Sequence, residues 1–455
     1  IVWMGTNFGG INYHHPSVYP FKVDLADGNF KHLSGNLVSA IAVDDDENTW
    51  VGTERDGLNV RKKGSDVYQK IELRSNTVKC LLTDDKYIYV GTFGAGLARI
   101  SRQNTKDICY YNIAGENGIT LLQNYISSIS RDRLGNIWIG TGNKGLQMIN
   151  SQFTTAIQPT STFTKNTVNN YIKDILASRN GSLLIGTAQG LGHFLNTAGQ
   201  QGIYRSGDLV KDHYINTVFE DRTSQIWIGT QEKGLYNYNP KTGAVTRVEL
   251  FPTHSYYHVL GIAENNANEI IISTNNGLVF YNKLTGAKRY MDIQDGFPTN
   301  EFLPKAIFCR DGQLLVGSHK GLISLNVSHH QLNTGVPKLL ISGFSINGLA
   351  RTTVDKVLDH LNPDRAEEIA LKHDQNTFTI DFSSDNLINP QKHSYAYKIE
   401  ELEKNWNLTD QPSITYTNLS PGRYTLQLKT ANNDGLWSNV SKSVVFNIAP
   451  PFYKS

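Results

Sequence analysis

Short stretches in which hydrophobic and polar residues alternate recur along residues 1 to 330, separated by turns rich in glycine, asparagine and aspartate. Alternation with a period of two is typical of half-buried β-strands. The centre of each stretch is a hydrophobic pair followed by Gly-Thr or a close variant, and a Gly-Leu-type pair ends it. The motif recurs at Trp3–Asn12, Trp50–Asn59, Tyr89–Ala98, Trp138–Gln147, Leu184–His193, Trp227–Tyr236, Ile271–Phe280 and Leu315–Ser324.

The spacing of this motif is regular. Its first glycine position falls at residues 5, 52, 91, 140, 186, 229, 273 and 317, where residue 273 is serine, so neighbouring motifs lie 39 to 49 residues apart. Another strand and a hairpin turn precede most motifs, as in Ile126–Trp138 and Ile215–Trp227. Two strands follow the hairpin, which gives four per repeat. This period is typical of β-propellers, whose radial repetition leaves only short, protected strand edges.

The number of blades follows from counting inner strands. Complete inner strands begin near Val38, Val78, Ile126, Ile172, Ile215, Val259 and Leu303, but none precedes the motif at Trp3. We therefore predict a seven-bladed β-propeller over residues 17–335, in which the segment around Phe21–Leu33 supplies the outer strand of the last blade. Residues 1–16 would be a stub of a preceding blade, from an upstream propeller. An eight-bladed ring is the alternative.

The recurring motif residues are better explained by packing than by chemistry. Trp50, Trp138 and Trp227 share one blade position and are expected to fill the space between neighbouring sheets. The acidic segment Asp44–Asn48 superficially resembles a calcium loop, but it lacks the glycine at the sixth position and the distal glutamate. Because it falls where every blade has its turn, we predict neither a metal site nor a cofactor.

A different kind of sequence follows the repeats. Its strands include Phe378–Ser383 and Tyr395–Ile399, and the segment Leu419–Tyr424 reads Leu-Ser-Pro-Gly-Arg-Tyr. A tyrosine in this setting is typical of the tyrosine corner of immunoglobulin-like sandwiches. The predicted fold class is therefore all-β, with a seven-bladed β-propeller followed by an immunoglobulin/fibronectin-like β-sandwich at residues 336–455.

Composition and charge narrow the function classes. Only 18% of residues are charged, while Gly (39), Tyr (22) and Phe (18) are plentiful, which suits many short strands. The formal net charge of +2 provides no global field for nucleic acid, so no nucleic-acid partner is predicted. Cys80, Cys109 and Cys309 are odd in number and form no CxxC pair, which argues against a disulfide framework and a zinc site.

Ligand recognition is expected at the variable turns. If each blade runs outward from the axis, the turns before the inner strands and those between the second and third strands share one face. Aromatic rings there could stack on a sugar, and polar side chains could hydrogen-bond it. The candidate ligand-binding residues are Arg55, Tyr125, Lys144, Tyr171, His213, Tyr214, Lys233, Tyr257, His258, Glu301 and Lys320.

Three of these candidates favour an acidic ligand. Lys144, Lys233 and Lys320 share the position before Gly-Leu, and a weakly basic ring of this kind suits an acidic or sulfated glycan through charge-assisted hydrogen bonds. An ordinary explanation stays open for each residue, since exposed lysines are usually solvated and turn residues often cap their own turn.

Two other function classes stay open. Catalysis would require paired carboxylates, a metal cluster or a nucleophile with its base, whereas Glu301 and His258 are only scattered candidates on one face. We therefore predict no catalytic residue and no enzymatic activity for this chain, and a propeller glycan lyase or hydrolase is the weaker alternative. A scaffold that offers its face to a protein partner is the stronger one.

Two groups of residues carry a family resemblance. The pattern Asp-x-x-Gly-Asn-Ile-Trp-Ile-Gly-Thr-x-x-x-Gly-Leu, complete at Asp132–Leu146, resembles the two-component-regulator propeller repeat. Tyr395-x-Tyr397, Tyr416–Tyr424 and Asn432–Trp437 resemble the Y_Y_Y sandwich domain. Together they cover nearly the whole chain and resemble the extracytoplasmic sensor region of hybrid two-component system histidine kinases of Bacteroidetes.

The resemblance implies a function for the full-length protein. It implies a periplasmic region of an inner-membrane receptor that recognises an oligosaccharide, signals through its sandwich and regulates polysaccharide-utilisation genes. A homodimer is implied as well, as is a membrane helix beyond Ser455, because Ile448–Ser455 resembles the segment that precedes such a helix. In this family a ligand can also lie between two propellers. This chain shows no kinase, phosphoacceptor or DNA-binding segment, so the resemblance assigns those activities elsewhere.

Overall fold

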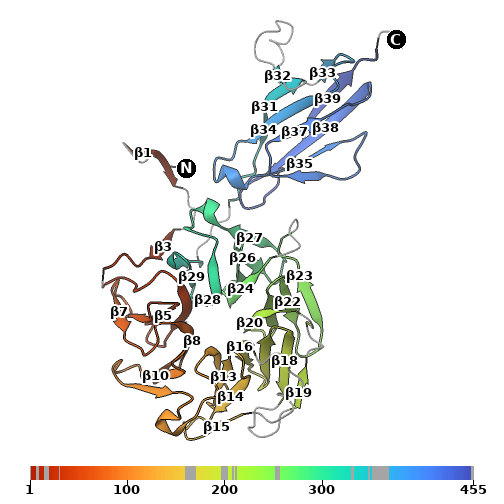
Figure 1. Ribbon diagram of the computed structural model, residues 1–455. Helices are drawn as coiled ribbons and strands as arrows, with labels where there is room; N and C mark the ends of the chain where they lie inside the picture. Colours follow the sequence, from red (N-terminus) through yellow and green to blue (C-terminus); the bar gives the residue numbers. More distant parts are fainter. Residues whose placement is uncertain are drawn as a thin grey trace. The chain divides into compact units, whose positions relative to one another are not determined.

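The computed structural model describes residues 2–6, 10–14, 20–29, 31–158, 171–195, 203–206, 210, 213–251, 257–328, 333–346, 349–350 and 368–451 (Figure 1). Apart from three short 3-10 helices, at Glu116–Gly118, Ile293–Asp295 and Pro390–Lys392, its regular elements are β-strands. The protein is therefore all-β, as the sequence predicts. No helix among the described residues is long and apolar enough to cross a membrane.

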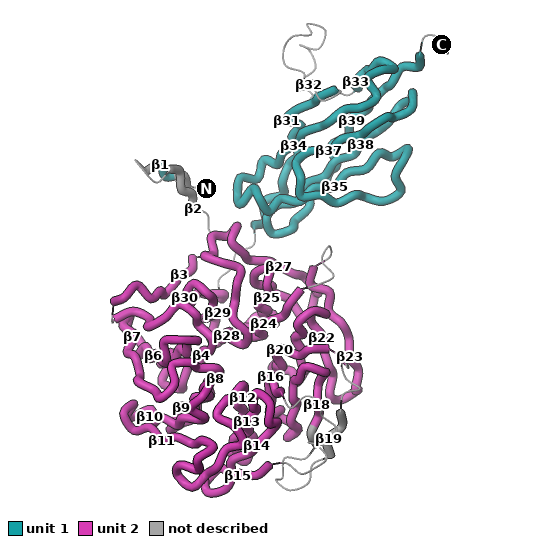
Figure 2. The backbone as a smooth tube through the Cα atoms, viewed as in Figure 1, with its two compact units in different colours: residues 1–18, 330–455 teal, residues 19–329 magenta. Residues whose placement is uncertain are grey.

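The chain forms two compact units (Figure 2). Residues 19–329 make up the larger unit, and residues 1–18 and 330–455 are grouped in the other. The first described strands, β1 (Val2–Thr6) and β2 (Gly10–His14), pair antiparallel as a hairpin. Each unit is described separately below.

The larger unit is a ring of seven four-stranded antiparallel sheets among its described residues (Figures 1 and 2). Neighbouring inner strands contact one another around the ring, and the later strands of each sheet lie further out. This is the predicted propeller architecture. The inner strands are β4 (Val38–Val43), β8 (Val78–Thr83), β12 (Ile126–Arg131), β16 (Ile172–Ala177), β20 (Ile215–Glu220), β24 (Val259–Glu264) and β28 (Phe302–Arg310).

The Gly-Thr motifs lie at the ends of the second strands. These are β5 (Thr49–Thr53), β9 (Tyr87–Thr92), β13 (Ile137–Thr141), β17 (Leu183–Thr187), β21 (Ile226–Thr230), β25 (Glu269–Thr274) and β29 (Gln313–Ser318). The third strands are β6 (Leu58–Arg61), β10 (Leu97–Ser101), β14 (Leu146–Ile149), β18 (Gly190–Leu195), β22 (Leu235–Tyr238), β26 (Gly277–Asn282) and β30 (Gly321–Asn326).

The ring is closed by a strand from the beginning of the chain. The outer strands are β7 (Tyr68–Ile71), β11 (Ile108–Tyr111), β15 (Ala156–Ile157), β19 (Ile203–Ser206), β23 (Val245–Val248), β27 (Lys288–Met291) and, in the last sheet, β3 (Phe21–Asp24). β3 pairs antiparallel with β30, so that Phe21 lies opposite Leu325 and Asp24 opposite Leu322. The segment around Phe21–Leu33 therefore supplies an outer strand, as the sequence predicts.

The motif glycines allow neighbouring sheets to pack closely. A Cβ atom on Gly52 would lie only 2.4 Å from Val78 of the next sheet, and one on Gly91 would lie 2.8 Å from Ile126. Contacts this short would force the sheets apart. Glycine at this position is therefore explained by packing.

The motif tryptophans are held by the aspartate that opens the preceding hairpin. Trp50, Trp138 and Trp227 are buried, and each indole N–H donates to such an aspartate, at 2.9 Å to Asp44, 2.9 Å to Asp132 and 3.0 Å to Asp221. Asp44 also accepts hydrogen bonds from Asn48 and lies 3.5 Å from Arg102. The carboxylate of the acidic segment thus organises a turn and orients a ring.

Residues 333–346, 349–350 and 368–451 form a β-sandwich. One sheet has the order β32 (Leu349–Ala350), β31 (Leu339–Ile346), β34 (Phe378–Ser384) and β37 (Ser413–Tyr416). The other has the order β33 (Glu368–Leu371), β39 (Lys442–Ile448), β38 (Gly422–Ala431), β35 (Ser394–Ile399) and β36 (Asn407–Thr409).

The core of the sandwich is aromatic. Phe378, Phe382 and Phe446 are almost completely buried between the two sheets. The Tyr424 hydroxyl donates to the backbone carbonyl of Ser420 at 2.9 Å. The predicted tyrosine corner is therefore confirmed.

Candidate ligand-binding site

The candidate site lies where the inner strands of the propeller begin, which we call the strand-start face. On this face, the residue before an inner strand lies beside the residue that follows the second strand of the same sheet. A backbone hydrogen bond joins the two residues. The pairs, named acceptor first, are Leu37 and Glu54, Thr77 and Phe93, Tyr125 and Gly142, Tyr214 and Gln231, His258 and Asn275, and Glu301 and His319. The two kinds of turn thus share one face, as the sequence predicts.

Four aromatic residues follow one another along this face, and we call Phe93, Tyr125, Tyr171 and Tyr214 the aromatic row. The ring centroids of Phe93 and Tyr125 are 4.9 Å apart, and those of Tyr125 and Tyr171 are 6.3 Å apart. The hydroxyl oxygens of Tyr125 and Tyr171 lie 3.1 Å from each other. Phe93 is 54% exposed, which is unusual for phenylalanine and leaves its ring open to a ligand.

Lys173 joins the row to its last member. Its Nζ lies 4.3 Å from the centroid of the Tyr171 ring and 4.8 Å from that of Tyr214. Lys173 occupies a register shift between Ile172 and Asp174, where β16 pairs with β17. A bulge of this kind re-aims a side chain, and here it directs an ammonium group between two rings.

The same register shift recurs near the start of β4, β8, β12, β20 and β24, and in three of these strands its side chain binds the next sheet. These three side chains donate to backbone carbonyl oxygens, from Ser39 to Val78 at 2.6 Å, from Ser127 to Ile172 at 2.5 Å and from Asn216 to Val259 at 3.0 Å. In β8 and β16 the position holds a lysine instead. Lys79 and Lys173 are therefore departures from a structural pattern.

Hydrogen bonding tunes the ionisation of the row. Burial lowers the pKa of Lys173, but hydrogen bonds to the hydroxyls of Tyr214 and Tyr171 outweigh it and raise the pKa above its ordinary value. Burial and the hydrogen bond to Tyr171 both raise the pKa of Tyr125. Burial also raises the pKa of Tyr171, yet hydrogen bonds to Tyr125 and Lys173 bring it below its ordinary value. Lys173 is thus positively charged at neutral pH.

A second lysine lies beside the row in an ion pair. Nζ of Lys79 is 2.6 Å from a carboxylate oxygen of Glu54, and both side chains are partly buried. Lys79 lies two residues after Thr77, whose backbone carbonyl accepts a hydrogen bond from Phe93 of the row, so the ion pair is close to the Phe93 end of the row. Glu54 thus neutralises Lys79, whereas no carboxylate lies within 4.0 Å of the Lys173 Nζ in the part of the chain that the structure describes.

A third lysine spans the central channel. Lys305 has a positive φ of 63° and lies in a wide register shift between Phe302 and Ile307 of β28. Its Nζ donates to the backbone carbonyls of Ser127 and Lys173, each at 2.8 Å, and lies 3.8 Å from Asp174. Lys305 therefore ties the last sheet to the third and fourth sheets across the ring.

The structure brings together only some of the residues predicted from the sequence. Tyr125, Tyr171 and Tyr214 form one continuous group through Lys173. His213 is half-buried, and its Nε2 lies 3.2 Å from the hydroxyl of Tyr236. The remaining polar candidates sit on separate turns: Arg55, Lys144, Glu301 and Lys320 are exposed, whereas Lys233 and His258 are half-buried.

Tyr257 occupies a different environment from the other candidate tyrosines. Its side chain is 0% exposed, and its hydroxyl accepts from the backbone N–H of Leu250 and donates to the carbonyl of Val248, both at 3.2 Å. It packs so closely on Gly234 that a Cβ atom there would lie 2.5 Å from the hydroxyl. In this structure the Tyr257 side chain has no surface to offer a ligand.

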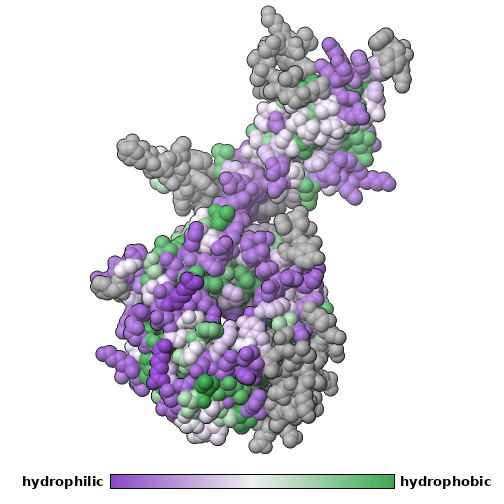
Figure 3. Space-filling model, in the orientation of Figure 1, coloured by the Kyte–Doolittle hydropathy of each residue, from purple (hydrophilic) through white to green (hydrophobic). Residues whose placement is uncertain are grey.

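Sequence reasoning missed the three lysines, because it searched turns rather than strands. For Lys79 and Lys173 the available signal was the second residue of the inner strand, which is Lys in Val78-Lys79 and Ile172-Lys173 but Ser in Val38-Ser39 and Ile126-Ser127. The visible face of the larger unit mixes apolar and polar residues (Figure 3). A row of rings with an ammonium group offers stacking and hydrogen bonding, and it contains no pair of carboxylates poised for acid–base chemistry.

Comparison with known proteins agrees with this architecture. Residues 386–449 match the family model described as the Y_Y_Y domain, and residues 120–143 match the two component regulator propeller. The extracellular domain of BT3049 from B. thetaiotaomicron, described as a hybrid two component system, matches with a TM-score of 0.76 and 25% sequence identity over 98% of this chain. The chain has the architecture of the extracellular region of a hybrid two-component system.

Two further matches support the same architecture. Histidine kinase P4 of Formosa agariphila is 26% identical over 443 residues, or 93% of this chain. The extracellular domain of BT4673 from B. thetaiotaomicron shares the fold, with a TM-score of 0.57 and 21% identity over 99% of this chain. The chain spans 32% of the length of the kinase and 60% of the length of the BT3049 structure.

Proposed function

We propose that this chain is the ligand-sensing extracytoplasmic region of a hybrid two-component sensor kinase and that it recognises an oligosaccharide. The observation that carries the proposal is the aromatic row with Lys173 on the strand-start face. Planar rings in sequence suit successive sugar units, whose apolar faces stack on aromatic side chains. The proposal places recognition here and expects binding without turnover.

An acidic oligosaccharide fits the row better than a neutral one. The pKa of the Lys173 ammonium group is raised, so this group carries a positive charge at neutral pH. No carboxylate lies within 4.0 Å of its Nζ among the described residues. A carboxylate or sulfate group on the ligand would form a charge-assisted hydrogen bond with it, which is roughly twice as strong as a neutral one. The exposed Lys144 and the half-buried Lys233 lie on turns of the same face and add to its positive potential.

Signalling would pass through the sandwich. In the full-length protein we propose a homodimer in the inner membrane with this region in the periplasm, a membrane helix beyond Ser455, and control of polysaccharide-utilisation genes as the output. A ligand can shift such a receptor only if it binds one arrangement of the protomers more tightly than another. Ligand-dependent cross-linking of cysteines introduced near Tyr453 in the full-length protein reports on this step.

The binding step is tested by titrating a panel of acidic and neutral oligosaccharides into this chain by calorimetry. The proposal expects saturable binding of an acidic member, unchanged ligand after incubation, and a loss of at least tenfold in affinity for Tyr171→Ala. Tyr110→Ala is the matched control, because Tyr110 lies in outer strand β11 and contacts Arg74 instead of the row.

Three outcomes would overturn this proposal. Cleavage of the oligosaccharide would make the chain an enzyme. Binding of a protein or peptide to this face, with no saccharide bound, would make it a scaffold. If Tyr171→Ala leaves the affinity unchanged both in this chain and in the full-length receptor, the ligand binds elsewhere, for example between propellers.

A further inference from the structure

One lysine reaches the aromatic row from a sheet that does not border it. Lys305 belongs to β28, which packs against β24 and β4. Tyr125 and Tyr171 instead precede β12 and β16, and β8 and β20 separate these two strands from β4 and β24. The Lys305 side chain therefore has to cross the central channel to reach the strands of the row.

The two oxygen atoms that accept from Lys305 belong to bulge residues. Its Nζ donates to the backbone carbonyls of Ser127 and Lys173, each at 2.8 Å. Ser127 lies in the register shift between Ile126 and Ser128, and Lys173 lies in the equivalent shift of β16. A bulge leaves the backbone groups of its extra residue outside the sheet ladder. Lys305 thus supplies donors to carbonyl groups that the ladder does not engage.

Each of these carbonyl groups lies two residues after a ring of the aromatic row. Ser127 comes two positions after Tyr125, and Lys173 comes two positions after Tyr171. The hydroxyl oxygens of the two tyrosines are 3.1 Å apart. One ammonium group therefore binds both backbone segments whose side chains meet in this pair, and one of the two segments carries Lys173 itself.

Other hydrogen bonds already join β12 and β16 further along the strands. The Ser128 hydroxyl accepts from the backbone N–H of Ile175 at 3.1 Å. The Ser130 hydroxyl accepts from the backbone N–H of Ala177 at 3.0 Å. These bonds hold the two strands together independently of Lys305, so the contribution of Lys305 is specific to the bulges beside the row.

The backbone conformation of Lys305 is unusual and directs its side chain to this place. Its φ of 63° lies in the left-handed region, which is disfavoured for a residue with a Cβ atom. The register shift around it extends from Phe302 to Ile307 and is wider than the shifts of the other inner strands. Strained backbone of this kind persists where the surrounding structure holds it, and it is frequent at functional positions.

Asp174 holds the ammonium group from the side of β16. Its Oδ1 lies 3.8 Å from the Lys305 Nζ and accepts from the Ser128 hydroxyl at 3.0 Å. Its Oδ2 accepts from the backbone N–H of Val218, in β20, at 2.8 Å. Two neighbouring sheets thus fix this carboxylate, and the carboxylate in turn restrains the position of the Lys305 ammonium group.

We propose that Lys305 is a positioning residue of the aromatic row. By binding both bulge carbonyls, it fixes the separation of Tyr125 and Tyr171. It also holds the bulge that places the Lys173 side chain between two rings. The proposal rests on the function proposed for the row and adds to it a residue that acts through the row from the last sheet.

Absorbance titration of tyrosinate in the chain without ligand tests this proposal. Burial raises the pKa of Tyr171, but hydrogen bonds to Tyr125 and Lys173 bring it below its ordinary value. The charges of Lys173 and Lys305 lower this pKa as well, and the effect of Lys305 is the smallest of these. Loss of the Lys305 charge alone would therefore move the Tyr171 titration by less than half as far as Lys173→Met.

We expect Lys305→Met to move the earliest tyrosinate component, which we assign to Tyr171, to higher pH by more than half the shift of Lys173→Met. The reason is that both bulge carbonyls lose their donor, so the hydrogen bond between Lys173 and Tyr171 is no longer held in place. Lys106→Met is the matched control, because Lys106 is exposed in the turn between β10 and β11. It should leave the earliest component unchanged.

Lys305→Gln provides a second variant in case Lys305→Met unfolds. Its amide can stay hydrated in the channel, but it is uncharged and one bond shorter than lysine, so it cannot span the two carbonyls. The same shift is expected. A lysine that only ties sheets together would lower the thermal midpoint and move the component by less than half the Lys173→Met shift. That result in a folded variant would overturn the proposal.

The calorimetric panel of oligosaccharides decides the function of the row separately. If no saccharide binds the unaltered chain, that function is wrong, while the titration still decides whether Lys305 positions the row. If a saccharide binds but the shift stays below half, Lys305 is not a positioning residue and the function proposed for the row stands.

Discussion

At the scale of single residues, the recognition proposed for the strand-start face depends on the position of Lys173. Ser39 and Ser127, at the same bulge in other sheets, donate to the neighbouring backbone. Lys173 instead directs its charge between Tyr171 and Tyr214. A single residue type at a repeated position thus replaces an inter-sheet contact with an ammonium group beside two rings, and the proposed recognition rests on this group.

Replacing this lysine should change selectivity more than stability. For Lys173→Met we expect affinity for an acidic oligosaccharide to fall about tenfold, or ~1.4 kcal/mol, while affinity for its neutral analogue changes by less than about threefold. Calorimetry on both ligands measures the difference. Equal losses for both would show that the charge of Lys173 does not select the ligand.

The tyrosine pair gives a pH-dependent signal. Because the Tyr171 pKa is lowered, this residue should ionise before an ordinary tyrosine, and its contribution to stability is present above the ordinary pKa of 10.0 and lost as pH falls through the lowered value. In a spectrophotometric titration of tyrosinate absorbance, Tyr171→Phe should remove the earliest component. Tyr110→Phe should keep it, and an early component that persists in Tyr171→Phe would contradict this assignment.

Sequence could predict which residues lie on the strand-start face where they directly precede a strand. Tyr125 and Tyr214 hold this position, and the structure brings both to the face. Tyr257 lies one residue earlier, before His258, and the chain turns its ring inward. Alternation alone does not place Lys173 on this face, because it assigns the residue to a sheet surface and only the bulge re-aims the side chain.

At the scale of elements, the bulge of the last inner strand couples distant sheets. Lys305 donates to two backbone carbonyls across the channel. Charge-assisted hydrogen bonds contribute about 1.5–3 kcal/mol each, and the side chain is 21% exposed, so we expect Lys305→Met to lower the free energy of unfolding by about 2 kcal/mol. Denaturant unfolding measures this change. A loss below about 0.5 kcal/mol, equal to that of Lys106→Met, would contradict the coupling.

The hairpin between the first two strands of a sheet depends on its opening aspartate. Asp132 accepts from the backbone N–H groups of Leu134 and Asn136, the Asn136 amide and the Trp138 indole. Asp132→Ala leaves these donors unpaired, and at about 1–3 kcal/mol per buried group we expect a loss of about 3 kcal/mol or more. Thermal or denaturant unfolding checks it, with the exposed Asp107→Ala as the control. A loss like that of the control would contradict the assigned role.

Elements with local signals were predictable from sequence. The Gly-Thr strands carry their own turn and packing residues, so Ile137–Thr141 and Ile226–Thr230 fall where the motif places them. The pairing of β3 with β30 joins residues about 300 positions apart and has no local signal. It was inferred only because the last blade lacked an outer strand.

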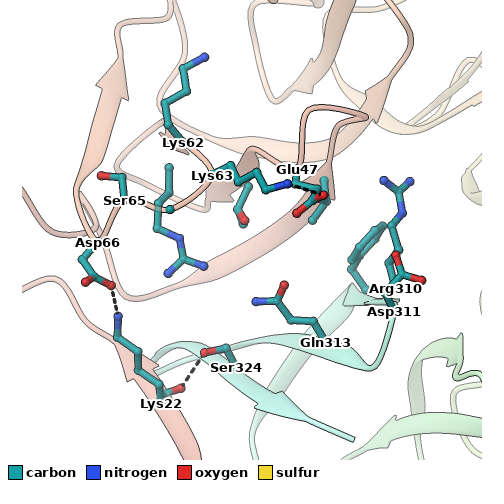
Figure 4. Close-up of a pocket in the computed structure, with 15 residues that line it drawn as sticks. Lys22, Glu47, Lys62, Lys63, Ser65, Asp66, Arg310, Asp311, Gln313 and Ser324 are labelled. Carbon is teal, nitrogen blue, oxygen red and sulfur yellow. Dashed lines mark hydrogen bonds and ion pairs between the residues drawn. The ribbon is translucent and has the colours of Figure 1, made fainter. Parts of the chain in front are cut away.

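At the scale of the whole molecule, the repeated motif builds the framework, and residues that differ from the repeat form the candidate ligand-binding site. The glycines and tryptophans of the motif are used in packing, which leaves the strand-start turns and bulges free to vary. The sandwich adds a separate core around Phe378 and Phe446 and an internally tied tyrosine corner. The two-module architecture was predictable from sequence, whereas the recess that Glu47, Lys62 and Gln313 help to line was not, because three separate turns and two strands build it (Figure 4).

Hydrogen–deuterium exchange of this chain with and without a bound acidic oligosaccharide tests the central claim most directly. The account predicts that protection concentrates in the peptides leading into β12, β16 and β20, where Tyr125, Tyr171 and Tyr214 lie, and that Tyr171→Ala abolishes it. Protection confined to other parts of the propeller or to the sandwich, with these three peptides unchanged, would contradict recognition by the aromatic row.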